Sequence, residues 1–274
     1  MSDDKREIKT ERILENPTLA IDHAGEGELL ILMHGIGGNR TNWTEQIEVF
    51  SEYFHTVAWD ARGYGESDDY DGPLDFNDFS RDLKRVLDYF GVEKAHISGL
   101  SMGGRISQSF YAMFPERVKT LTLIATFTGF NNFSDAEKQK FLDLRLKPLV
   151  EEGKDVMDIA PVVAKTLVGP HATEAQYQQL VDSMKYLHKE SYIKTVRATT
   201  MFDQTANLEN ISVPTLLVFG ENDSLTNPTI GKTMADRITG CEFKVIPKSG
   251  HLINLEQSQL FTETMLEFLL KHRG

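Results

Sequence analysis

The chain has 274 residues, of which 40% are hydrophobic, and this is enough for a single α/β unit with a sizeable core. Its 29 basic and 41 acidic residues give a formal net charge of −12 at pH 7, which repels phosphate backbones and argues against a nucleic-acid partner. No apolar run approaches the ~18 residues of a membrane span, and residues 1–7 are too charged for a secretory signal. A single cysteine, Cys241, excludes an intrachain disulfide. We therefore expect a cytoplasmic protein that does not bind a membrane.

Short apolar runs and helical patterns alternate along most of the chain. Residues 1–25 predict one or two amphipathic strands, and near-continuous apolar runs, typical of strands covered on both faces, follow them. Helical spacing within residues 79–90, 105–114 and 255–270 predicts helices between and after these runs. This alternation predicts a doubly wound, mostly parallel sheet. The runs expected to be strands are residues 29–33, 57–59, 95–98, 121–125, 216–219 and 243–246.

The alternation stops between residues 127 and 204, where we find no strand pattern. Residues 134–137 (Ser-Asp-Ala-Glu) and 173–176 (Thr-Glu-Ala-Gln) have the spacing of a capping box, and helical apolar spacing comes after each. We therefore divide the chain into a core, residues 1–126 and 205–274, and a helical insertion, residues 127–204, placed between two strands.

The most informative motif is Gly-Leu-Ser-Met-Gly at residues 99–103, between a predicted strand and a predicted helix. At such a sharp turn a serine adopts a strained backbone conformation that exposes its hydroxyl, and flanking glycines make room for it. We expect Ser101 to be a nucleophile and the backbone N–H of Met102 to point toward the oxygen that gains charge. An unactivated serine also needs a base, and that base needs an orienting acid.

The candidate acid and base come later in the chain, each after a predicted strand. Asp223 and then His251 follow Ser101, which is one of the chain orders known for a serine triad. Glu221, two residues from Asp223, is a competing acid. Because the carboxyl ends of parallel strands meet at one edge of a sheet, we expect these side chains to converge there.

A glycine-rich loop at residues 34–38 (His-Gly-Ile-Gly-Gly) follows an earlier strand. Such a loop can turn the Ile36 N–H toward the same point, where it would complete an oxyanion hole with the Met102 N–H. We interpret His34 as a residue that shapes this loop by bonding nearby backbone.

These motifs occur in the order of the α/β-hydrolase superfamily, which the chain resembles over nearly its whole length. The resemblance rests on the loop at 34–38, residues 60–67 (Asp-Ala-Arg-Gly-Tyr-Gly-Glu-Ser), the turn at 99–103, residues 220–223 and residues 250–251. Within the superfamily, the chain is most similar to small capped esterases, enol-lactonases, cofactor-free haloperoxidase-type enzymes and carbon–carbon bond hydrolases. The resemblance implies that the helical insertion is a cap, and that Arg62, within residues 60–67, ties loops together.

The expected activity is that of a serine hydrolase. The predicted triad, Ser101, His251 and Asp223, would cleave a small carboxylic ester, lactone or enol-lactone with an apolar body through an acyl-enzyme. We expect no cofactor and no metal, because the chain has no H-E-x-x-H motif and no cysteine pair. The partner is then a small-molecule carbonyl substrate. No periodic seam predicts an oligomeric state.

Two alternatives stay open. A carbon–carbon bond hydrolase of a vinylogous diketone acid would use the same triad and would need cations near the site. Arg105, Arg145 and Arg197 are candidates, although the sequence favours the surface for each. The second alternative is a ligand receptor with this fold and little turnover. Aromatic and apolar residues of the insertion belong either to its core or to the pocket wall: Phe127, Phe130, Phe133, Phe141, Tyr192, Met201 and Phe202.

Overall fold

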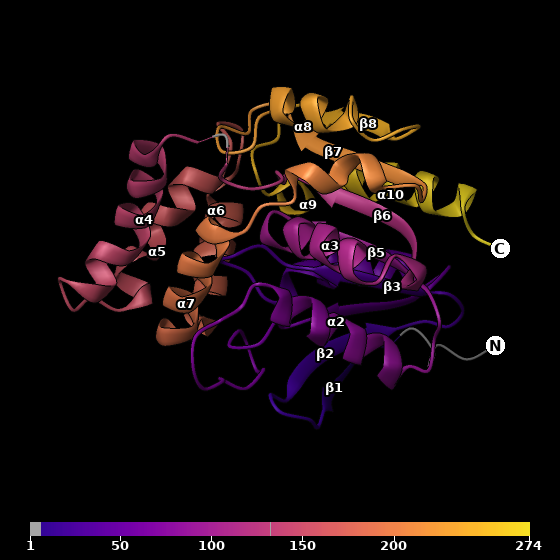
Figure 1. Ribbon diagram of the computed structural model, residues 1–274, viewed down its shortest axis with the longest axis horizontal. Coiled ribbons are helices and arrows are strands. Elements are labelled where there is room, and N and C mark those ends of the chain that lie inside the picture. Colours follow the sequence, from indigo (N-terminus) through magenta and orange to yellow (C-terminus); the bar gives the residue numbers. More distant parts are fainter. Residues whose placement is uncertain (1–6, 132) are drawn as a thin grey trace.

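The computed structural model describes residues 7–131 and 133–274, and a single mixed sheet runs through it (Figure 1). The sheet has eight strands in the order β1-β2-β4-β3-β5-β6-β7-β8. β2 is antiparallel to both of its neighbours, and all the other adjacent strands are parallel. The predicted doubly wound, mostly parallel sheet is confirmed. The strands are β1 (Lys9–Ile13), β2 (Leu19–Ala24), β3 (Leu29–Met33), β4 (His55–Trp59), β5 (Ala95–Leu100), β6 (Val118–Ile124), β7 (Thr215–Gly220) and β8 (Glu242–Ile246).

Helices cover both faces of the sheet, because successive residues of a strand point to opposite faces. In β3, Ile31 and Met33 belong to one hydrophobic cluster, and Leu30 and Leu32 belong to another. All four are fully buried, and burying one such side chain contributes ~1.5–3 kcal/mol. The first cluster includes residues of α2 (Asn77–Tyr89), α3 (Met102–Met113) and α8 (Pro228–Ala235), and the second includes residues of α1 (Thr44–Phe50), α9 (Ile253–Glu256) and α10 (Ser258–Lys271).

Four further helices lie together beyond one end of the sheet, where β6 and β7 have their carboxyl ends (Figure 1). We call them the cap helices: α4 (Asp135–Val150), α5 (Val156–Leu167), α6 (Glu174–Ser183) and α7 (Lys189–Met201). Both predicted capping boxes are confirmed at the starts of α4 and α6. The start of α5 carries a third capping box, in which Asp155 and Asp158 cap each other's backbone. We did not predict this helix from the sequence.

Short helices complete the chain. The 3-10 helices are η2 (Arg40–Trp43), η3 (Pro115–Arg117), η4 (Met184–Tyr186) and η5 (Thr205–Asn210).

α8 was also not predicted, although Asn227 caps it and Pro228 occupies its first position, which is a common helix start. Within residues 7–131 and 133–274, no helix has both the length and the apolar character needed to cross a membrane.

Candidate active site

Ser101 occupies a strained turn between β5 and α3. Its backbone has φ 54° and ψ −110°, in a region that residues with side chains rarely adopt. The Ser101 N–H donates to the carbonyl of Ile124 at 2.8 Å. A Cβ on Gly103 would lie 2.4 Å from the Met33 carbonyl oxygen, and one on Gly99 would lie 2.1 Å from the backbone of Gly103. Both glycines are therefore needed for this close packing around the serine.

Asp223 and His251 are in direct contact, from loops that follow β7 and β8. His251 Nδ1 lies 2.8 Å from Asp223 Oδ2, and both side chains are buried. Since a carboxylate only accepts hydrogen bonds, Nδ1 carries the proton and Nε2 is the free ring nitrogen. The Glu221 carboxylate instead accepts from the Lys248 N–H at 2.9 Å. Of the two candidate acids, only Asp223 bonds the His251 ring.

The surroundings of Asp223 favour its ionised form. Burial by itself raises the pKa of this carboxyl, but the His251 ring and the Thr226 hydroxyl and N–H outweigh it and lower the pKa. The Thr226 hydroxyl donates to Asp223 Oδ2 at 2.6 Å, and the N–H groups of Leu225 and Thr226 reach Oδ1 at 2.8 and 2.9 Å. A carboxylate fixed in this way can hold the His251 ring in one orientation.

Ser101 and His251 line the same cavity, which has a volume of about 270 Å³. Ile36 and Met102 lie on its wall too. Among the described residues, no hydrogen bond joins the Ser101 hydroxyl to the His251 ring; in free enzymes such bonds are often long and tighten when substrate binds. No side chain caps the N-terminus of α3, and no described residue accepts a hydrogen bond from the Ile36 N–H. Both amides are therefore available to a substrate oxygen.

The His34 ring fixes the loop that carries Ile36. Its Nε2 accepts the Ala61 N–H at 3.1 Å, so Nδ1 is the protonated nitrogen and donates to the Gly35 carbonyl at 2.8 Å. Burial lowers the pKa of His34 and keeps the ring neutral. The predicted role of His34 as a loop-shaping residue is confirmed.

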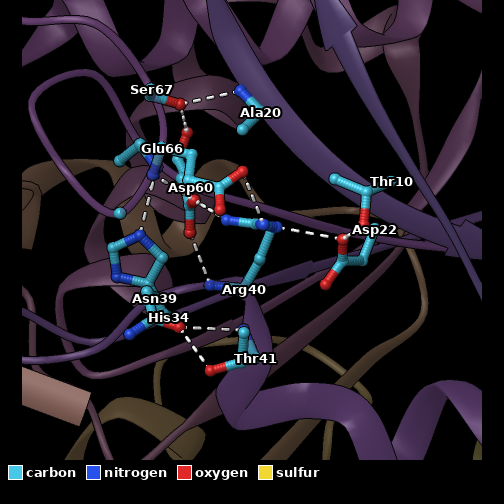
Figure 2. A network of polar contacts seen from close by, with 12 residues as sticks. Thr10, Ala20, Asp22, His34, Asn39, Arg40, Thr41, Asp60, Glu66 and Ser67 are labelled. Atoms are coloured by element: carbon cyan, nitrogen blue, oxygen red, sulfur yellow. Dashed lines mark hydrogen bonds and ion pairs between the residues drawn. The ribbon is translucent and has the colours of Figure 1, made fainter. Parts of the chain in front are cut away.

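A buried network around Arg40 holds the end of the same loop (Figure 2). The Arg40 guanidinium pairs with Asp22, Asp60 and Glu66. Asp60, which has no exposed surface, also accepts the Arg40 and Glu66 N–H groups at 2.7 and 2.8 Å. Three carboxylates surround this one cation, so its charge is fully compensated inside the protein.

Glu256 connects the cap helices to the loop that carries His251. Its Oε2 accepts the N–H groups of Gly169, after α5, and of Gly250, each at 2.9 Å. The His251 N–H donates to the Leu167 carbonyl at 3.0 Å, at the end of α5. Burial raises the pKa of Glu256 even though three backbone N–H groups bond its carboxylate. No sequence motif indicates this contact, because its partners are backbone amides distant in the chain.

Arg62 ties the loop after β4 to α2, whereas the resemblance implied an arginine that ties loops to each other. Its guanidinium bonds both oxygens of Asp82, at 2.6 and 2.8 Å, and pairs with Asp78.

Two of the three arginines assigned to the surface are buried, and this prediction was wrong. Arg105 on α3 and Arg145 on α4 are 2% and 3% exposed and lie on the cavity wall, whereas Arg197 on α7 is exposed. Arg105 is four residues after Ser101, on the part of α3 that the cap helices cover. Arg145 lies where α4 packs on α7. Arginine is usually found at the surface, and the packing of the cap helices on α3 and on each other is what buries these two.

The seven aromatic and apolar candidates within residues 127–204 differ in where they lie. Four of the seven candidates line the cavity: Phe127, Phe130, Phe133 and Phe141. Tyr192 and Phe202 are buried, but Met201, at 87% exposed, belongs to neither group.

Comparison with known proteins agrees with this architecture. A family model described as alpha/beta hydrolase fold matches residues 28–258. The chain belongs to the alpha/beta hydrolase family. It is 29% identical over 255 residues to the 2-hydroxy-6-oxononadienedioate/2-hydroxy-6-oxononatrienedioate hydrolase of Paraburkholderia phymatum, covering 88% of this chain and 87% of that protein. The protein of the same name from Escherichia coli K12 is 29% identical over 261 residues, covering 90% and 89%.

Solved structures of this family are similar over nearly the whole chain. A thermophilic esterase from Thermogutta terrifontis has a TM-score of 0.88 at 25% identity, covering 97% of this chain and 100% of that one. The enol-lactonase of Burkholderia xenovorans LB400 has a TM-score of 0.83 at 21% identity, covering 95% and 100%, and shares the fold. Together these findings identify this alpha/beta hydrolase as a hydrolytic enzyme.

Proposed function

We propose that the protein is a serine hydrolase in which Ser101, His251 and Asp223 form the catalytic triad. The observation that carries this proposal is a strained serine on the wall of the same cavity as a His251 ring bonded to Asp223 at 2.8 Å. His251 Nε2 removes the Ser101 proton as the serine oxygen attacks a carbonyl carbon. Asp223 keeps the ring in the required tautomer and stabilises the imidazolium.

The Ile36 and Met102 N–H groups stabilise the oxyanion of the tetrahedral intermediate. His251 then gives its proton to the leaving oxygen, which departs and leaves an acyl-serine. A water molecule, deprotonated by His251, attacks this ester; the acid is released as His251 returns that proton to the Ser101 oxygen. The small, largely apolar cavity favours a small carboxylic ester, lactone or enol-lactone as substrate.

The test is hydrolysis of p-nitrophenyl acetate, butyrate and octanoate by the wild type and by Ser101→Ala. We expect kcat to fall by at least about 10³-fold in the variant, since the nucleophile is lost. Ser98→Ala is the matched control, because Ser98 is a buried serine of β5 whose hydroxyl bonds no described residue. Turnover near the wild-type rate by Ser101→Ala, or none by a folded wild type on any ester or lactone, would overturn the proposal.

A second candidate is carbon–carbon bond hydrolysis of a vinylogous diketone acid by the same residues. The names of the Paraburkholderia and Escherichia relatives specify a dioate, which is a dicarboxylate, and two arginines line this cavity. Loss of the dienol absorbance of a hydroxy-oxo-dienoate substrate, with release of the two product acids, distinguishes this activity from ester hydrolysis. Slow turnover of every carbonyl substrate, together with tight binding of one, would instead favour a receptor.

A further inference from the structure

The cavity wall contains two buried positive charges that no ion pair within the described part of the chain compensates. Among residues 7–131 and 133–274, no carboxylate forms an ion pair with the guanidinium of Arg105 or of Arg145. A buried charge is costly unless it is paired and fully hydrogen-bonded. Two such charges on one cavity therefore suggest that a bound ligand supplies the missing negative charge.

Among the described residues, Arg105 forms hydrogen bonds with neutral groups only. It donates to the Thr199 hydroxyl and the Phe202 carbonyl, while its Nε has no partner in the described chain. Asp203 raises its pKa through space without forming an ion pair. Burial nevertheless lowers the pKa of Arg105 to about 9, which leaves the group cationic at neutral pH. Rings surround the guanidinium at 5.0–5.5 Å: Phe76, Phe127, Phe130 and Phe202.

Arg145 is held even more weakly. Its one hydrogen bond, to the Phe141 carbonyl of its own helix, is 3.4 Å long, and its Nε has no partner within the described residues. The guanidinium lies 3.9 Å from the centroid of the Phe141 ring. Burial lowers the pKa of Arg145 as well. Most of its donor capacity is therefore uncommitted.

The two arginines belong to one region of the cavity. The Phe130 ring, next to Arg105, and the Phe141 ring, next to Arg145, have centroids 5.0 Å apart. Arg105 is also one helical turn beyond Ser101. An aromatic wall with a cation at each side thus begins beside the candidate nucleophile and ends on a cap helix.

We propose that Arg105 and Arg145 bind a carboxylate carried by the substrate, so that this hydrolase acts on acidic carbonyl compounds. The proposal rests on the serine-hydrolase function proposed above. Guanidinium groups bind carboxylates through charge-assisted hydrogen bonds, which strengthen where water is excluded. Phe130 and Phe141 would pack against the apolar body between the carboxylate and the scissile carbonyl. The sequence left an acidic substrate open only as the alternative of a vinylogous diketone acid, and this proposal extends it to acidic esters and lactones.

Binding tests the proposal without turnover. Calorimetric titration of Ser101→Ala with γ-benzoylbutyrate and with the neutral γ-benzoylbutyramide compares two ligands of equal size. We expect the acid to bind at least about tenfold more tightly, as a hydrogen bond to a charged group implies. We also expect Arg145→Met, made in the Ser101→Ala background, to remove this preference. Equal affinity for acid and amide in the parent would overturn the proposal.

Kinetics with a matched ester pair gives a second readout. The ratio of kcat/KM for mono-p-nitrophenyl glutarate to that for p-nitrophenyl valerate should fall at least about tenfold in Arg145→Met, mainly through KM for the acidic ester. Arg145→Lys, which keeps the charge, should recover part of the ratio. Arg197→Met, an exposed arginine of α7, is the control and should leave the ratio unchanged.

These outcomes separate the two proposals. If a folded wild type hydrolyses neither these two esters nor any other ester or lactone, the serine-hydrolase proposal fails, and the calorimetric comparison still decides whether the cavity prefers an acid. If both esters are hydrolysed with the same ratio in the wild type, Arg145→Met and Arg197→Met, carboxylate binding is refuted while serine hydrolysis stands.

Discussion

Buried arginines occur in two regions of the molecule, around Arg40 and on the cavity wall at Arg105 and Arg145. Carboxylates compensate the charge in the first region and, within the described part of the chain, not in the second. Arg40 follows the loop of Ile36 in the chain and contacts three carboxylates (Figure 2). The two cavity arginines are at least as buried and contact none among the described residues. The difference shows that burial alone does not identify a functional charge. Whether a carboxylate pairs with the charge is the more informative property. A compensated cation supports the fold, and an uncompensated one on a cavity wall is free to bind a ligand.

This contrast also separates the two sides of the cavity. On the core side, His34, Arg40 and Glu256 make most of their bonds to the backbone or to buried carboxylates, and they fix the loops that carry Ile36 and His251. On the cap side, where the cap helices cover α3, aromatic rings and the partly unbonded guanidinium groups of Arg105 on α3 and Arg145 on α4 form the wall. We infer that the core side positions the chemistry and that the cap side selects the substrate.

The largest effect is expected from breaking the compensated cluster. Arg40→Met leaves Asp22 and Asp60 buried without their cation, so we expect the free energy of unfolding to fall by about 3–5 kcal/mol. Urea denaturation measures it. Arg12→Met is the control, because Arg12 and Asp68 form an ion pair with side chains 45% and 51% exposed, which is worth about 0–1 kcal/mol. Equal losses in the two variants would contradict our account of the cluster.

Glu256→Gln tests a buried carboxylate that, among the described residues, accepts hydrogen bonds from backbone N–H groups only. One acceptor oxygen is replaced by a donor that faces N–H groups, so we expect a loss of about 1–3 kcal/mol in acid and a lower kcat, as the His251 loop shifts. Because the folded pKa of Glu256 is raised, its favourable contribution is complete below its ordinary value of 4.5 and is lost as pH rises through the folded value.

The difference in unfolding free energy between wild type and Glu256→Gln should therefore narrow as pH increases. Urea denaturation of both proteins across the acid to neutral range measures this trend. A difference that widens with pH would show that the Glu256 carboxylate is stabilised in the fold and would contradict the raised pKa.

The smallest effect on stability is expected at Arg145. Arg145→Met removes one long hydrogen bond and a ring contact, but it also removes an uncompensated buried charge, so the net change should stay within about 1 kcal/mol. Urea denaturation beside Arg40→Met makes the comparison direct. A loss as large as that of Arg40→Met would show that Arg145 supports the fold, and would weaken its assignment to substrate binding.

Much of this architecture could be predicted from local sequence patterns. Apolar runs located the buried strands, and the capping boxes at residues 134–137 and 173–176 located α4 and α6, because caps and periodicity depend on near neighbours in the chain. α5 was missed because its capping residue, Asp155, is paired with Asp158 and not with the glutamate or glutamine of the usual signature.

The sequence by itself determined the mostly parallel sheet, the starts of α4 and α6 and the turn at Ser101, since backbone strain, strand periodicity and helix capping are all encoded within a few residues. Only the tertiary structure decided which charges are compensated. Arg40 and Arg105 cannot be distinguished by residue type or local pattern. Arg40 contacts Asp22 on β2 and Asp60 at the end of β4. Arg105 instead contacts aromatic rings and the Phe202 carbonyl, which follows the last cap helix. Charge compensation depends on what distant segments bring to one point in space.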